Sequence, residues 1–256
     1  MVAIGGVAVT VLVAGTCGGV IGGAIPTAAY RLSVAWRTPP RQSCDSCGDQ
    51  LPAGVRGWLR WGSRCPACGR RNGPHPALMS AGCAVAFAGF AARFGCTPQL
   101  VPFLAILPLG FLLAAIDMAC YRLPEALVFP AIGGSACCFA GLAAATGQWP
   151  SLGSSLLGAL AFGAGYLLLA VLPGGQLGLG DVTLAVLLGL YLGWLGWPFV
   201  LLGAVLPFVV NAPVALWVLI VSPAGRGSEL AFGPAMLGGG YLAVIGPPAL
   251  ATLLAR

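Results

Sequence analysis

Residues 100–117 of the chain read LVPFLAILPLGFLLAAID, seventeen residues without a charge followed by an aspartate. A transmembrane helix needs about 20 mainly apolar residues, and stretches of similar length recur on both sides of this one, almost from end to end. Of the 256 residues, 59% are hydrophobic and only 7% are charged, whereas a soluble domain usually carries about 25% charged residues. The composition therefore predicts a polytopic membrane protein.

The apolar stretches predict an all-α bundle of about eight transmembrane helices, interrupted near the start by one long polar insertion. The expected helices cover residues 2–30, 77–94, 100–116, 126–145, 152–172, 182–194, 198–221 and 234–254. We expect three parts: a first transmembrane helix at 1–30, a cytoplasmic four-cysteine loop at 31–77 and a seven-helix domain at 78–256. The first stretch is too long for a secretory signal core and has no basic residue before it, so we expect a retained anchor.

The twelve basic residues are all arginines, and their distribution predicts the orientation in the membrane. Eight of them lie between Arg31 and Arg71, directly after the first expected helix. Cytoplasmic loops carry an excess of basic residues, so we expect this loop in the cytoplasm and both termini outside. The net charge of +6 is then a topology signal, compatible with contact to the lipid bilayer, and we expect no nucleic-acid partner.

Four of the ten cysteines form two Cys-x-x-Cys pairs in the polar loop. Seventeen residues separate Cys44 and Cys47 from Cys65 and Cys68, and a glycine follows each pair. Four thiolates in this pattern suit a tetrahedral structural zinc ion, which can supply most of the folding energy of a loop with little core. The alternative is two redox-active or metal-free pairs. The other six cysteines fall in or beside apolar helices, where cysteine behaves as a small hydrophobe.

Two of the six acidic residues stand at the edges of apolar helices. Asp117 follows the stretch 100–116 and Asp181 precedes the stretch 182–194, both on the side expected in the cytoplasm. A carboxylate at membrane depth is costly and commonly marks a functional site. The simpler alternatives are that Asp181 caps its helix and that Asp117 snorkels into the lipid headgroups.

The chemistry that fits two such acids is peptide hydrolysis. Two carboxylates about 3 Å apart share one proton, because both cannot easily ionise. The ionised one can take a proton from an attacking water, and the protonated one can donate to the oxyanion and to the leaving amine. Gly178 and Gly180 leave room for substrate backbone beside Asp181. The pair therefore predicts an aspartyl protease.

Three short motifs resemble the type IV prepilin peptidases, the leader peptidases of pilus and type II secretion systems. Residues 178–181 read Gly-Leu-Gly-Asp, similar to that family's Gly-x-Gly-Asp motif. Asp117 followed by Leu-Pro-Glu at 123–125 looks like its first-aspartate motif, and Phe-Gly-Pro at 232–234 resembles its late element. The resemblance covers nearly the whole chain and implies an intramembrane aspartyl endopeptidase of the inner membrane. Such an enzyme removes the short basic leader of prepilins or pseudopilins on the cytoplasmic face, with Asp117 and Asp181 as its catalytic pair.

The resemblance also implies a substrate site around the two acids. The residues expected to contact substrate are Gly178, Gly180, Glu125, Glu229, Gly233 and Pro234. The two glutamates lie on expected cytoplasmic turns, where their charge could attract a basic leader.

Many members of that family also methylate the new N-terminus, using the cysteine loop and S-adenosylmethionine. Here the loop is shorter than the usual one, and Met79 stands where the family has an acid. Thr183 replaces a common lysine, and Pro26 replaces an asparagine. We therefore expect cleavage, with methylation weak or absent.

Two other functions remain open from the residues. A transporter or proton channel could use Asp117 and Asp181 as a relay, although no acid lies near the centre of an expected helix. A non-catalytic subunit of a secretion machine would need neither acid for chemistry.

Overall fold

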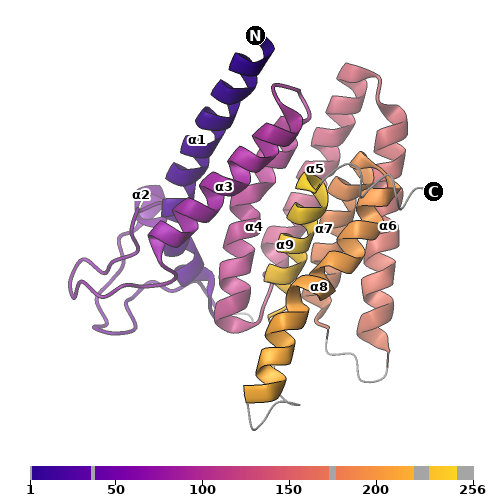
Figure 1. Cartoon of the computed structure of the whole chain (residues 1–256). Coiled ribbons are helices and arrows are strands. Elements are labelled where there is room, and N and C mark those ends of the chain that lie inside the picture. The colour runs from indigo at the N-terminus through magenta and orange to yellow at the C-terminus, as the bar shows by residue number, and fades with distance from the viewer. Residues whose placement is uncertain (1, 36–37, 173–176, 222–230, 247–256) are drawn as a thin grey trace. The chain divides into compact units, whose positions relative to one another are not determined.

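The chain is all-helical in the computed structural model, which describes residues 2–35, 38–172, 177–221 and 231–246 (Figure 1). In these residues β-pairing is limited to two isolated bridges, Ser43 with Gln50 and Arg64 with Arg71. The helices form two compact units, residues 1–120 and 121–256. The predicted fold class, a helical membrane bundle, is confirmed.

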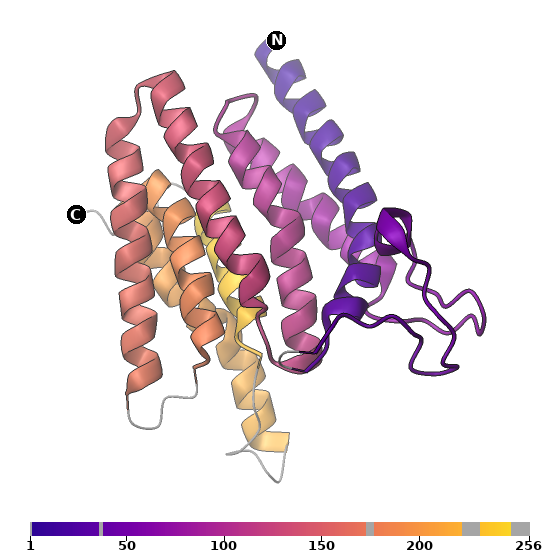
Figure 2. The same ribbon diagram turned by 180° about the vertical axis from the view of Figure 1, so that it is seen from behind.

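The first unit holds the polar loop and three long helices. Its helices are α1 (Val2–Leu32), α2 (Gly54–Trp58), α3 (Pro76–Phe94) and α4 (Leu100–Cys120). The long helix α1 packs along α3 and also touches α4, and the polar loop lies at the C-terminal end of α1 (Figures 1 and 2).

Glycines set the close approach of α1 and α3. A Cβ added at Gly18 would lie 2.6 Å from the ring of Phe87, and one at Gly22 would lie 2.5 Å from the carbonyl oxygen of Met79. Because nothing larger than hydrogen fits at either position, the two backbones touch almost directly, as small residues permit in membrane helices.

In the part of the second unit that the structure describes, four helices pack against a fifth. They are α5 (Glu125–Thr146), α6 (Trp149–Val171), α7 (Leu179–Leu195), α8 (Trp197–Val221) and α9 (Gly233–Ile245). The helix α7 contacts each of the other four. Its side chains include some of the most buried of the unit, such as Leu184 and Leu190. It is the central helix, and Asp181 lies in its first turn.

The contact between α6 and α7 is again backbone on backbone. A Cβ added at Gly189 would lie 2.5 Å from the carbonyl oxygen of Gly158. The hydroxyl of Ser155 donates to the carbonyl oxygen of Leu190 at 2.6 Å. On another side of α7, Phe139 of α5 stacks on Trp194 with ring centroids 4.7 Å apart. This packing holds the C-terminal half of α7 against α5 and α6.

Five helices, α1 and α3 to α6, are long and apolar enough to cross a membrane. Of the other apolar helices, α7 and α9 are shorter, and α8 is apolar over Trp197–Pro213. With 17 residues, α7 is roughly 25 Å long, less than the hydrocarbon core of about 30 Å. Except at the end of the last one, the expected helices begin and end within a few residues of those observed, while α2 was not predicted. The last helix was expected to reach residue 254, and α9 ends at Ile245. Residues 247–254 of the last expected helix lie outside the described residues.

Candidate functional site

The four loop cysteines come together in one cluster, as their spacing predicts. The Sγ atoms of Cys44, Cys47, Cys65 and Cys68 all lie within 4.8 Å of one another. Cys44 is 3.9 Å from Cys68, and Cys47 is 3.6 Å from Cys65. Tetrahedral zinc with Zn–S bonds of about 2.3 Å places its sulfurs about 3.8 Å apart. The cluster can therefore bind a metal ion, and its donor set and spacing fit zinc.

The two halves of the cluster are built in the same way. The N–H of Gly48 donates to the carbonyl oxygen of Cys44 at 2.9 Å, and that of Gly69 donates to Cys65 at 3.0 Å. Both glycines have positive φ, 73° and 67°, which glycine adopts without strain. The backbone N–H groups of Ser46 and Cys47 lower the pKa of the Cys44 thiol to about 6. Each knuckle is therefore a tight turn that presents two sulfurs.

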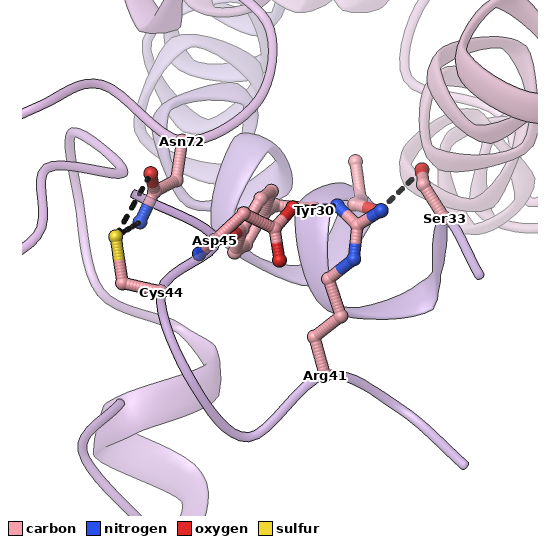
Figure 3. A network of polar contacts seen from close by, with 7 residues as sticks. Tyr30, Ser33, Arg41, Cys44, Asp45 and Asn72 are labelled. Atoms are coloured by element: carbon pink, nitrogen blue, oxygen red, sulfur yellow. Dashed lines mark hydrogen bonds and ion pairs between the residues drawn. The ribbon is translucent and has the colours of Figure 1, made fainter. Parts of the chain in front are cut away.

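Polar contacts fix the cysteine loop to the end of α1 (Figure 3). The hydroxyl of Tyr30 accepts the N–H of Asp45 at 2.9 Å. Asp45 also pairs with Arg41 at 3.1 Å, and the Arg41 guanidinium lies 4.9 Å from the centre of the Tyr30 ring. Asp45 therefore bridges the loop to the helix while its side chain stays exposed. Asn72 lies 3.8 Å from Cys44 Sγ, so a polar contact also reaches the four-cysteine cluster.

Asp117 lies in the last turn of α4, which continues to Cys120 and not only to Ile116. Its side chain is 5% exposed, next to the fully buried Ile116. A buried position does not favour the alternative in which Asp117 extends into the headgroups. A buried carboxylate is costly and usually marks a functional site in a membrane helix.

Asp181 is the third residue of α7, where it closes a tight turn. Its Oδ2 accepts the N–H of Gly178 at 3.1 Å, and its own N–H donates to the carbonyl oxygen of Gly178 at 3.0 Å. The N-terminus of a helix also stabilises negative charge. Asp181 therefore caps the start of α7, as the simpler alternative expected. This cap orients its carboxylate at the half-buried start of the central helix.

The turn before Asp181 packs on a second predicted motif. A Cβ added at Gly180 would lie 3.0 Å from the Cβ of Leu123. Leu123 and Pro124 lead into α5, whose first residue is Glu125. Thr183, which stands where the resembled family commonly has lysine, donates its hydroxyl to the carbonyl oxygen of Gly180 at 2.8 Å. Two motifs that are about 55 residues apart in the chain therefore meet within the second unit.

The other expected substrate residues lie at the start of a helix or outside the described residues. Gly233 and Pro234 form the first turn of α9. The preceding residue, Phe232, packs on Phe208 with ring centroids 5.2 Å apart. Glu125 is half-buried at the start of α5, and Glu229 lies outside the described residues. Asp117 belongs to the first compact unit, and Asp181 to the second.

The sequence interpretation missed Tyr166 of α6. Its side chain is 3% exposed, and its hydroxyl has no hydrogen-bond partner among the described residues. The Tyr166 ring centroid lies 6.2 Å from that of Phe232. The Tyr166 hydroxyl also interacts electrostatically with the Asp181 carboxylate. A tyrosine in an apolar span needs a partner for its hydroxyl, and this signal could have identified the residue.

Comparison with known proteins identifies the family. A model of the type IV leader peptidase family matches residues 104–212. A prepilin leader peptidase/N-methyltransferase of Pseudomonas putida is 31% identical over 219 residues, covering 80% of this chain and 72% of that protein. The chain belongs to the type IV leader peptidase family. Similar proteins of the same name from Burkholderia pseudomallei (strain 1026b) and Aeromonas hydrophila are 29% and 28% identical. They are matched over 83% and 80% of this chain and over 68% and 71% of their own lengths.

Membership of this family makes the chain a protease and a multi-pass protein of the inner membrane. A peptidase family favours hydrolysis over a relay in a transporter or proton channel, and over a non-catalytic secretion subunit. The segment matched by the family model contains both Asp117 and Asp181 and ends before Phe232. No solved structure matches this leader peptidase.

Proposed function

We propose that this leader peptidase removes the short basic leader of type IV prepilins or pseudopilins, with Asp117 and Asp181 as an aspartyl pair. One observation carries the proposal: among the described residues, Asp117 is the buried carboxylate, and Asp181 opens the central helix of its unit. The names of the curated relatives support the substrate class.

The reaction needs the carboxylates of Asp117 and Asp181 about 3 Å apart with one shared proton. The Gly178 N–H and the N-terminus of α7 stabilise negative charge on Asp181, so we place the initial charge there. Asp181 then takes a proton from the attacking water while Asp117 donates its proton to the developing oxyanion. When the C–N bond breaks, Asp181 gives the proton that it gained to the leaving amine, and Asp117 takes a proton back from the collapsing gem-diol. Protons move within the pair at each step, which makes it titrate as a unit.

Tyr166 acts in this proposal as a positioning residue. Its buried hydroxyl can donate to the Asp181 carboxylate and hold it in the reactive orientation once substrate has entered. The ring stays in place through its contacts with Phe208, at 6.4 Å, and Phe232, at 6.2 Å. Phe232 precedes Gly233 and Pro234, so this aromatic cluster links Asp181 to the late motif.

We propose that the substrate backbone binds beside Gly178 and Gly180 and that the basic leader binds near Glu125 and Glu229. Gly178 is exposed and Gly180 is half-buried, so an extended peptide can approach Asp181 from the side of the turn. Glu125 and Glu229 supply negative charge for the leader, and Gly233 and Pro234 form the facing wall.

The remaining assignments follow the arginine distribution and the cysteine cluster. Both termini lie outside, and the aspartates act on the cytoplasmic side. The functional parts are the helix at 1–30, the zinc loop at 31–77 and the peptidase domain at 78–256. Zinc in the cluster Cys44, Cys47, Cys65 and Cys68 is structural, since four thiolates leave no coordination position open for substrate.

N-methylation with S-adenosylmethionine is a second candidate function, because the curated relatives carry it in their name. Against it, Met79 replaces an acid and cannot hold a cationic donor through charge. We expect the chain to cleave prepilins and to methylate them weakly or not at all. A gain of one methyl mass on the mature N-terminus, dependent on added S-adenosylmethionine, would contradict this.

The direct test uses the full chain reconstituted in lipid vesicles with a purified prepilin. We expect loss of the leader, seen as a mature N-terminus by mass spectrometry. An intact prepilin after prolonged incubation, with the protein folded, would overturn the proposal.

A further inference from the structure

A small cleft separates the C-terminal end of α1 from the cysteine loop, within the first unit. It is lined by eleven residues, none of them acidic, and three are the arginines Arg31, Arg60 and Arg64. Ser63 and Asn72 add polar groups to the wall. The cleft has room for about one or two water-sized groups, and it opens outward. It is therefore a positively charged recess that can take a single oxygen atom of a larger anion.

Two buried polar atoms in this cleft have no partner. Arg31 is 4% exposed and Ser63 is 5% exposed. Neither Arg31 Nε nor Ser63 Oγ makes a hydrogen bond to any described residue. A buried donor without an acceptor destabilises a fold, more so when it is charged. Both atoms are donors that a bound oxygen could satisfy together.

Two hydrogen bonds and an aromatic ring hold the guanidinium of Arg31 in place. Its terminal nitrogen donates to the carbonyl oxygen of Pro52 at 2.7 Å and more weakly to that of Gly57 at 3.4 Å. Its Cζ atom lies 5.1 Å from the centre of the Trp58 ring. These contacts leave Nε unused. Arginine forks of this kind recognise planar or tetrahedral oxyanions.

No acidic residue lines the cleft to balance its three arginines. The ion pair near it joins Arg41 to Asp45, and Asp45 does not line the cleft. Among the described residues Arg31, Arg60 and Arg64 form no ion pair. Arg60 and Arg64 are exposed at the mouth, where their long side chains can reach the outer oxygens of a bound group.

We propose that this cleft binds a phosphate group, with one oxygen on Arg31 Nε and Ser63 Oγ and the others at Arg60 and Arg64. The phosphate could come from an anionic phospholipid headgroup or from a soluble phosphate ester. The end of a transmembrane helix forms one wall. Trp61, which packs on Gly23 and is 58% exposed, is of the residue type that concentrates at headgroup depth.

The test measures binding by the full-length protein and needs no peptidase activity. Native mass spectrometry is performed on protein exchanged into nanodiscs of phosphatidylglycerol or phosphatidylcholine, and thermal unfolding is followed in detergent with and without inorganic phosphate. The variant is Arg60→Gln with Arg64→Gln, since both side chains are exposed and the fold should tolerate the change. Arg70→Gln, an exposed arginine of the same loop that does not line the cleft, is the matched control. Ser63→Ala removes the inner hydroxyl without changing the charge.

We expect retained phosphatidylglycerol or a phosphate-dependent rise in Tm in the wild type and in Arg70→Gln. The double variant should lose about tenfold in affinity, as expected for charge-assisted hydrogen bonds, and Ser63→Ala should lose less. Retention of phosphatidylglycerol without a response to phosphate identifies a lipid ligand. A response to phosphate without lipid preference identifies a soluble one. Equal binding by the wild type and the double variant, or no binding of either probe, would overturn the proposal.

Discussion

The cysteine loop and the aspartate turn are both short polar segments at the end of a helix, but they reach their geometry differently. Each cysteine knuckle is closed by bonds within about seven residues of chain. The Asp181 turn instead packs on Leu123, from the segment before α5, and interacts with Tyr166 of α6, so it depends on distant parts of the second unit. The loop should therefore depend on its metal and the turn on helix packing, so that each can be damaged without the other.

The largest effect is expected from the aspartates. Asp117→Asn and Asp181→Asn each remove one member of the proton-sharing pair while keeping its shape. Leader cleavage should fall by a factor of about 100 or more, while the metal content of the purified protein stays unchanged. Cleavage assays paired with metal analysis check this. Near-normal cleavage by either variant would show that the pair is wrongly assigned.

Removal of the Tyr166 hydroxyl should have a smaller effect with a distinctive signature. Tyr166→Phe keeps the ring contacts and removes a donor to the Asp181 carboxylate. We expect kcat to fall about tenfold with little change in KM. The acidic limb of the pH–rate profile should move to higher pH, because the charged form of the pair loses a hydrogen bond.

Tyr191→Phe is the matched control for Tyr166, because its buried hydroxyl bonds to Ser135 at 2.9 Å, away from the aspartate turn. It should lose about 1 kcal/mol of stability and keep the pH profile of the wild type. If Tyr166→Phe has the same pH–rate profile as the wild type, Tyr166 only packs against its neighbours and does not position Asp181.

Glu125→Gln should affect substrate binding more than chemistry. The lost charge should raise KM for a basic leader about threefold at low salt, and the difference should fade at high salt as screening grows. Asp49→Asn, an exposed acid of the cysteine loop, should leave KM unchanged. A loss of kcat that does not respond to salt would point instead to a direct catalytic role for Glu125.

The smallest effect on cleavage is expected from the metal cluster. Purified protein should contain about one zinc, and Cys44→Ser should lower this content and expose the loop to proteolysis, since structural zinc provides much of the folding energy of such segments. Cleavage should change by less than about twofold in a short assay. Cys137→Ser, an exposed cysteine of α5, is the control. Metal-free protein from a chelator-free preparation would refute the zinc assignment.

The sequence predicted those features that depend on local spacing or on long apolar runs. The knuckles at Cys44 and Cys65 and the start of α7 near Asp181 followed directly from such patterns. The five-residue helix α2 was missed, because so short a segment shows no periodicity. The unpaired Nε of Arg31 could not be predicted, because it becomes notable only when packing buries it without a partner. Tyr166 could have been noticed as a tyrosine in an apolar span, but its interaction with Asp181 depends on helix packing that the sequence does not show.

The central claim is that Asp117 and Asp181, which lie in different compact units, work as one catalytic pair. A double-mutant cycle in the reconstituted cleavage assay tests this most directly, using Asp117→Asn, Asp181→Asn and the double variant. Groups that act as a unit are strongly non-additive, so the double variant should cleave within about threefold of either single variant. Losses that multiply, to about 10,000-fold from two losses of about 100-fold, would show that the two aspartates act independently and contradict the account.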